Sequence, residues 1–173
     1  AKEEVLRVLH PGAKAIIGGE EVVKPFADGT DDWSYPYHGP DNNPQSADQV
    51  VRAPYLTQFI AEPKFAPSPA VTVASAGRVF RVTGHLAHKA NQNPMLNTLL
   101  AVNAYNGSTL WKRPVSEGFM VLRNTIIATP DTLYLADDDS CNLLDAATGK
   151  LMDEIRSPEP QVDGTVWKWM ALD

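Results

Sequence analysis

Two similar turn segments that lie 42 residues apart constrain the fold of this chain more than any other feature. The first is centred on Gly107 and the second on Gly149, and Asn103 matches Asp145 at the same spacing. Glycine and Asn or Asp are residues that tight turns favour, because they accept left-handed backbone or hydrogen-bond to it. An internal repeat of about 40 to 50 residues is typical of folds built from one supersecondary unit per repeat.

Short apolar runs surround both turns and predict β-strands. Several alternate apolar with small or polar residues, which is the period of a half-buried strand. Asn106-Gly107 lies between two runs, and this pair is the strongest short hairpin signal because both residues tolerate positive φ. The predicted strands cover residues 71–74, 78–82, 98–102 and 109–112 in the first cycle, and 125–128, 132–136, 141–144 and 151–155 in the second.

Four short strands per repeat are typical of a β-propeller, in which each repeat is one blade. A closed propeller needs about four blades or more, and this chain has room for about two. The sequence therefore predicts a mainly β fold with about two four-stranded antiparallel blades, after a short helix–strand segment and a Pro-rich coil. Both ends of the chain are expected to be cuts through a longer polypeptide. The expected segments are 1–24 (tail of a preceding domain), 25–69 (Pro- and aromatic-rich lead-in), 70–115 and 116–158 (blades) and 159–173 (start of a further blade).

In the first copy, the turn residues resemble the PQQ-like β-propeller repeat, whose last hairpin carries Ala-x-Asp-x-x-Thr-Gly-x-x-x-Trp. This copy keeps Ala101, Gly107 and Trp111, and it has Asn103 and Asn106 in place of Asp and Thr. An Asn, like an Asp, is able to accept hydrogen bonds from the backbone of the turn.

The second copy keeps a different part of the same pattern. Asp145, Thr148 and Gly149 match it, whereas Leu143 and Asp153 stand where Ala and Trp belong. In the family, the Trp packs between neighbouring blades, so the exchange at Asp153 predicts a weaker joint there. The resemblance covers residues 31–173, including Asp32-Trp33 and residues 38–43, which look like the lead-in before a first blade.

The front of the chain has a different character. Residues 5–9 form an amphipathic helical stripe, Pro11-Gly12 ends it, and residues 15–17 predict a short buried strand. Residues 3–17 resemble the late helix-turn-strand of class I AdoMet-dependent methyltransferases, with Ala13 in place of the second Gly of Leu-x-Pro-Gly-Gly. The alternative is an isolated amphipathic helix that enters a strand.

These resemblances leave three functional hypotheses open. The favoured one is a fragment of a larger PQQ-like propeller protein with a binding or scaffolding role and no self-contained catalytic site or cofactor. The second is part of a quinoprotein dehydrogenase that oxidises alcohols or sugars with PQQ and calcium. The third is the propeller portion of a methyltransferase-linked protein. The propeller resemblance also implies a periplasmic or extracellular location.

Composition narrows the partners. The net charge is -6, so no basic stripe is available to neutralise the phosphates of a nucleic acid. No apolar run approaches the roughly 18 residues that a membrane-spanning helix needs. Two blades would leave exposed sheet edges and bare faces, so the chain is expected to associate with the remaining blades of its ring or with other chains.

Four groups of residues are candidate sites of chemistry. His85 and His88 form a ligand-like pair, but no third metal ligand follows, and solvated loop histidines are the simpler interpretation. Residues 137–139 are three consecutive Asp, which lack the spacing of a calcium loop and are expected to be a solvated turn. Cys141 opens an apolar strand and is expected to be a core residue rather than a nucleophile.

Aromatic residues form the fourth group. They are candidates for a surface that stacks on a sugar or quinone, and the simpler interpretation is that they pin the coil and the blade faces. The candidate ligand-facing aromatics are Trp33, Tyr35, Trp167 and Trp169, and Tyr37 and His38 lie next to the first two.

Overall fold

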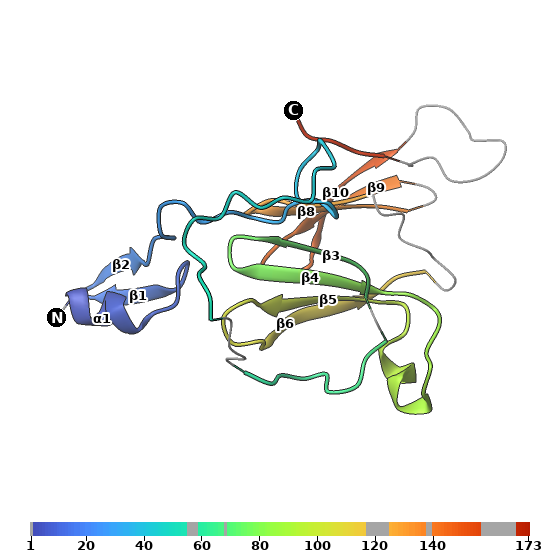
Figure 1. The fold of residues 1–173 in the computed structure, drawn as a ribbon, viewed down its shortest axis with the longest axis horizontal. Helices are drawn as coiled ribbons and strands as arrows, with labels where there is room; N and C mark the ends of the chain where they lie inside the picture. The colour runs from blue at the N-terminus through green and yellow to red at the C-terminus, as the bar shows by residue number, and fades with distance from the viewer. Residues whose placement is uncertain (1, 55–58, 68, 117–124, 138–139, 157–168) are drawn as a thin grey trace. The chain divides into compact units, whose positions relative to one another are not determined.

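The computed structural model of the chain contains two compact units (Figure 1). The smaller consists of Ala1–Asp31 and Ser46–Thr57, and the larger of Asp32–Gln45 and Gln58–Asp173. Residues 25–69, predicted as one lead-in segment, therefore contribute to both units. The structure describes residues 2–54, 59–67, 69–116, 125–137, 140–156 and 169–173.

The smaller unit contains one helix and one hairpin. Helix α1 (Lys2–Val8) precedes strand β1 (Lys14–Ile17), which pairs antiparallel with strand β2 (Glu20–Val23). The order of helix, turn and strand is the predicted one, but the prediction of a buried strand was wrong, since Ile16 is 78% exposed. The neighbouring residues Ala15 and Ile17 are half-buried. The second strand was missed because it begins with two glutamates.

Helix α1 has no buried residue among those described. No helix in the described part of the chain is long and apolar enough to cross a membrane.

The chain leaves the smaller unit after Asp31 and returns to it at Ser46. The Asp31 carboxylate accepts hydrogen bonds from the Ser46 hydroxyl at 3.0 Å and from the Ala47 N–H at 2.7 Å. Residues 32–45 thus form an excursion whose two ends are tied together at its base.

The first sheet of the larger unit is a four-stranded antiparallel sheet, here called blade 1. Its strands follow one another in space as they do along the chain, which is the simplest up-and-down order. The strands are β3 (Pro69–Ser75), β4 (Arg78–Thr83), β5 (Thr98–Asn103) and β6 (Thr109–Pro114).

A second sheet of the same order, blade 2, follows it. The mainly β fold with two four-stranded antiparallel blades is therefore confirmed. Its strands are β7 (Ile126–Ala128), β8 (Thr132–Ala136), β9 (Ser140–Asp145) and β10 (Leu151–Arg156).

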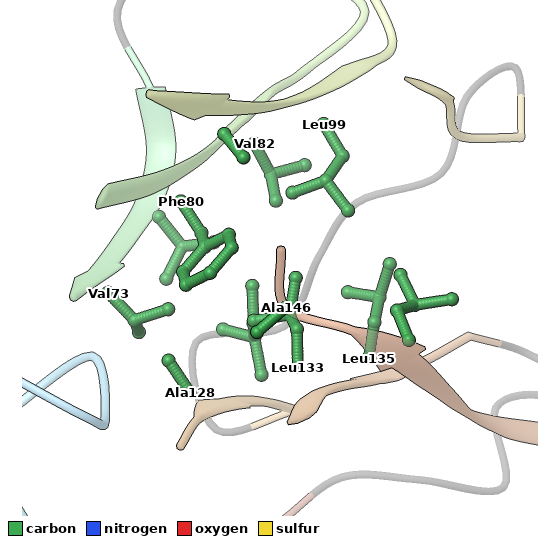
Figure 2. Packing of buried hydrophobic residues seen from close by; sticks show 12 residues of the cluster. Val73, Phe80, Val82, Leu99, Ala128, Leu133, Leu135 and Ala146 are labelled. Carbon is green, nitrogen blue, oxygen red and sulfur yellow. The ribbon is translucent and has the colours of Figure 1, made fainter. Parts of the chain in front are cut away.

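The main hydrophobic core lies between the two blades. Figure 2 shows Phe80 and Leu99 of blade 1 directed toward Leu133 and Leu135 of blade 2. All four side chains are at most 5% exposed. The two sheets thus stack face to face, and the apolar faces that sequence alternation predicts are buried against each other.

Strand register shows that the two blades are equivalent row by row. In blade 1, Val73, Phe80, Ala101 and Trp111 are cross-strand partners, and they face blade 2. The corresponding row of blade 2 must face away from blade 1, because alternate rows of a sheet point to opposite sides. This row of blade 2 consists of Ile127, Tyr134, Leu143 and Asp153. We call the side of blade 2 that faces away from blade 1 the next-blade face. The side of blade 1 that faces away from blade 2 is the preceding-blade face.

Residues 85–95 form an insertion between β4 and β5 that has no counterpart between β8 and β9 of blade 2. His85 and His88 are exposed, as expected for a surface loop. The end of the insertion differs from that expectation, because it forms a short 3₁₀ helix, η1 (Ala90–Met95), with Met95 only 9% exposed. The Thr83 hydroxyl donates to the Met95 carbonyl and fixes this end against the blade.

Candidate functional site

The two repeat turns have the same hydrogen-bond pattern. In blade 2, Asp145 Oδ1 accepts from the N–H groups of Ala147 and Thr148, at 3.0 and 2.7 Å, and from the Thr148 hydroxyl at 2.7 Å. The Gly149 N–H donates to the Asp145 carbonyl at 2.8 Å. The Thr148 hydroxyl and backbone hold the pKa of Asp145 below its ordinary value, and Arg78 adds a favourable charge.

In blade 1, Asn103 takes the place of this aspartate. Its Oδ1 accepts from the N–H groups of Tyr105 at 2.8 Å and Asn106 at 3.3 Å, and the Gly107 N–H donates to its carbonyl at 2.8 Å. Gly107 has φ +70, whereas Asn106 is absent from the described residues with positive φ. The predicted hairpin is confirmed, because β5 pairs antiparallel with β6, but of the Asn-Gly pair Gly107 alone is left-handed. The side chain of Asn103 favours a longer loop with one left-handed residue.

Trp111 joins the two blades. Its Nε1 donates to the Ala146 carbonyl at 3.1 Å, and its ring also lies 5.8 Å from that of Phe80. A Cβ added to Gly149 would lie 2.6 Å from Cδ2 of the Trp111 ring. Arg113 supports the same joint, with Nη1 donating to the Gly149 carbonyl at 3.3 Å. The last strand of blade 1 thus packs on the repeat turn of blade 2.

The preceding-blade face of blade 1 is covered by residues 59–67. Ala66 packs on a cluster formed by Met95, Leu100 and Val102, and Gln92 Nε2 donates to the Ala66 carbonyl at 3.0 Å. A cavity of about 230 Å³ remains between this segment and the sheet.

Within the described part of the chain, the next-blade face of blade 2 is partly covered. Residues 169–172 lie against Ile127, Tyr134, Cys141 and Ile155 and leave a hollow of about 320 Å³. Ile155 is 47% exposed there. The region 159–173, predicted as the start of a further blade, falls mostly outside the described residues, and 169–173 are not a strand in this structure.

The lead-in segment hydrogen-bonds to both blades and to the end of the chain. Trp33 pairs with Ala74 at the edge of β3, and the Ser34 carbonyl accepts from the Ala128 N–H of β7 at 2.9 Å. The hydroxyl of Tyr35 then accepts from the Leu172 N–H at 3.0 Å. Three consecutive residues thus contact blade 1, blade 2 and the C-terminal segment in turn.

The candidate aromatic residues have different surroundings. Trp33 Nε1 donates to the Pro36 carbonyl at 3.3 Å, and its ring meets His38 edge-on with centroids 5.3 Å apart. Trp169 lines the hollow of the next-blade face and is 54% exposed. Trp167 lies outside the described residues. Through these contacts Trp33 stabilises the lead-in segment. Trp169 is exposed and stays a candidate for contact with a ligand.

The candidate reactive groups are tied into local structure. Asp137 accepts from the Ser140 N–H and from Asn142 Nδ2, both at 2.9 Å, while residues 138–139 lie outside the described part. Cys141 is 2% exposed, and burial, with the nearby Asp137 carboxylate, raises the pKa of its thiol to about 11. A thiol with this pKa is almost entirely protonated at neutral pH and is a poor nucleophile.

The described residues show no cluster of acidic or imidazole side chains around a metal position. Calcium requires several oxygen ligands from one locality. Within the described ranges, no group of three or more His, Cys, Asp and Glu side chains is arranged to hold a metal ion.

Sequence reasoning missed the two segments that cover the outer faces. The sequence did not single out Phe59 as a contact residue, and residues 169–172 were expected to belong to the start of a further blade. The sequence does contain a signal that Phe59 contacts the fold, because an aromatic residue stands before the prolines of a segment rich in turn residues. Its partner is distant in sequence, so no local pattern identifies the contact.

Comparison with known proteins yields distant similarity to solved structures. No model of a protein family matches the chain, and no curated protein sequence matches it. Among solved structures, a europium-containing methanol dehydrogenase is similar with a TM-score of 0.38 and 16% sequence identity. The match covers 51% of this chain and 15% of that one, so the chain spans a small part of that protein's length. None of these comparisons supports the methyltransferase resemblance of residues 3–17.

Proposed function

We propose that this chain is a portion of a larger PQQ-like β-propeller protein and that its role is to bind further blades or to act as a scaffold. The proposal rests on the two stacked blades, the matching turns and the unequal covering of the two outer faces. A periplasmic or extracellular location belongs to the same proposal.

The next-blade face of blade 2 carries the proposal. Its row equivalent in blade 1 is buried against a neighbouring sheet, with Phe80 and Val73 fully buried. In blade 2, residues 169–172 are the described residues that lie on the same side. Ile127 is 1% exposed beneath them, whereas Ile155 is 47% exposed and Trp169 is 54% exposed. An apolar sheet face that is left open beside its buried equivalent is an interaction surface, because covering it removes apolar area from water.

The occupant that fits this face is a further blade of the same repeat. The contact between blades 1 and 2 provides the template, with alternating apolar rows on both sheets and a turn that receives the outer strand. Asp153 stands where Trp111 stands in blade 1, so the joint at blade 2 lacks the indole contact. It relies on the apolar residues of β7, β8 and β9.

The experiment compares two substitutions on β10. Ile155 lines the open face, whereas Met152 is similarly exposed, at 50%, and is not part of its lining. We expect the chain to self-associate at micromolar concentration in sedimentation velocity. Ile155→Asp should shift it toward monomer by about tenfold or more in dissociation constant, because a carboxylate in the interface must be desolvated. Met152→Asp, the matched control, should behave as the wild type.

A monomeric, cooperatively folded wild type at micromolar concentration would contradict the proposal. The enzymatic alternative has its own test, in which PQQ and calcium are added and cofactor absorbance and dye-linked alcohol oxidation are followed. The proposal expects neither signal from this chain, and clear oxidation would replace the scaffolding role with the dehydrogenase one.

A further inference from the structure

Gly107 and Gly149 are covered by aromatic rings in the same way. A Cβ added to Gly149 would lie 2.6 Å from the Trp111 ring, and one added to Gly107 would lie 2.7 Å from Cδ2 of Phe59. The two glycines have φ of +70 and +71, so their backbones are alike as well. Trp111 comes from the blade that precedes Gly149. Phe59 does not belong to a blade, yet its ring occupies the corresponding position over Gly107 of blade 1.

The rest of residues 59–67 extends this correspondence. Ala61 also packs on Gly107, where a Cβ would lie 2.5 Å from that of Ala61. Leu100 and Val102, on the same face, are each only 5% exposed. Their repeat equivalents in blade 2, Asn142 and Leu144, face blade 1. The segment therefore covers the sheet surface that a preceding blade would cover.

We propose that residues 59–67 take the place of a neighbouring blade and close blade 1 on this side, with Phe59 in the role of the inter-blade aromatic ring. A blade that approached the preceding-blade face would meet Phe59 and Ala61 already seated on Gly107. Further blades are then added only at the next-blade face of blade 2, a consequence that rests on the function proposed above.

This closure sets how the chain associates. With the preceding-blade face closed, each molecule has one open face, the next-blade face of blade 2. Two molecules that pair through this face leave no open face, so association stops at a dimer. Two complementary open faces per molecule would permit head-to-tail growth into longer assemblies. Removal of the Phe59 ring opens the preceding-blade face of blade 1. The next-blade face of another molecule is complementary to this face and is able to bind there.

The first experiment measures assembly size by sedimentation velocity and mass photometry. Phe59→Ser is compared with Phe65→Ser, a matched control on the same segment whose ring is 60% exposed and is not seated on Gly107. We expect the wild type and Phe65→Ser to stop at dimers, and Phe59→Ser to form species of three or more chains. Equal assembly of Phe59→Ser and Phe65→Ser would overturn the closure.

A second experiment keeps the inference testable if Phe59→Ser does not fold. Phe59→Trp places an indole where Trp111 stands in the next repeat, with the carbonyl of Ala104 in the position of the Ala146 acceptor. We expect its indole N–H to exchange with solvent at least about tenfold more slowly than that of Ile60→Trp, since Ile60 is 88% exposed. Equal exchange would show that residue 59 does not occupy the position over Gly107.

The two proposals fail in different ways. If Ile155→Asp leaves association unchanged while the Phe59→Trp indole is protected, the proposed function fails and the role of Phe59 stands. If Ile155→Asp disrupts association while Phe59→Ser assembles as the control does and the Phe59→Trp indole is unprotected, the closure fails and the proposed function stands.

Discussion

The indole of Trp111 fills the space that any side chain at position 149 would need. Cδ2 and Cε3 of the ring would both lie 2.6 Å from a Cβ at Gly149, and Nε1 donates to the Ala146 carbonyl at 3.1 Å. One tryptophan thus makes a packing contact and a hydrogen bond with the turn of the following repeat. The glycine is required twice, once for its φ of +71 and once for its bare Cα.

Substitutions at Trp111 should separate the two parts of this joint. Trp111→Phe keeps a ring over Gly149 but loses the hydrogen bond to Ala146, and we expect it to reduce the free energy of unfolding by about 1 kcal/mol. Trp111→Ala removes the ring as well, and the expected loss is about 3 kcal/mol. Urea denaturation of both variants measures the difference, and equal losses would show that the ring contributes nothing beyond its N–H.

Gly149→Ala should be destabilising for two reasons that a double mutant separates. The left-handed backbone costs an alanine about 1 kcal/mol, and the clash with Trp111 adds about 1 to 3 kcal/mol. In a Trp111→Ala background only the backbone cost remains. We therefore expect Gly149→Ala to cost less in that background, as measured by urea unfolding of the four proteins of the cycle. If Gly149→Ala costs the same free energy in both backgrounds, the Trp111 ring moves aside without strain.

Asp145 should make stability depend on pH in the acid range. Its pKa is lowered in the folded chain, chiefly by the Thr148 hydroxyl, so its contribution is present above the unfolded value of about 3.9 and is lost as the pH falls through the lower folded value. Asp145→Asn keeps an acceptor, as Asn103 does in blade 1, but does not titrate. The stability difference between wild type and variant should be constant above about pH 5 and should shrink on acidification.

That difference is measured by urea unfolding at a series of pH values below 5. A variant with the same acid dependence as the wild type would assign the titration to other carboxylates.

Cys141 should make stability depend on pH in the alkaline range. Its folded pKa of about 11 exceeds the unfolded value of about 8.5, so the thiol favours the folded state equally at all pH below about 8.5 and less as the pH rises toward 11. Cys141→Ala should lack this loss, although it lowers stability at every pH by emptying a buried position. Unfolding of both proteins between pH 7 and 10.5 measures it, and parallel curves would contradict the raised pKa.

The strands of the two blades were predictable because their signals are local. Alternation in β3 and the Gly at each repeat turn depend on residues that are neighbours in sequence. Strand β2 was missed because its first residues, Glu20 and Glu21, are polar. It is stabilised by pairing with β1, which the local sequence does not reveal. The burial expected for residues 15–17 failed for a related reason, since burial depends on a covering layer that local sequence does not describe.

The candidate surfaces were less predictable than the strands. The repeat identified Trp111 and Gly149 as structural residues, but not that the ring of one rests on the other. Phe59 shows the limit most clearly, because its place on Gly107 depends on a Pro-rich coil returning to the sheet. Trp33 was a candidate ligand-facing residue in the sequence. The structure shows that its backbone pairs with Ala74 and its ring packs on His38, contacts that no local pattern identifies.

The amino-acid sequence by itself determined the repeat, the four-strand cycle and the turn chemistry, because hydrophobic alternation and the φ of glycine act over a few residues. Only the tertiary structure decided which faces are covered. Contacts such as Phe59 with Gly107, or residues 169–172 with Ile155, join segments that are distant in sequence and are selected by the free energy of burying apolar surface. That selection leaves blade 1 covered by its own chain and blade 2 partly open.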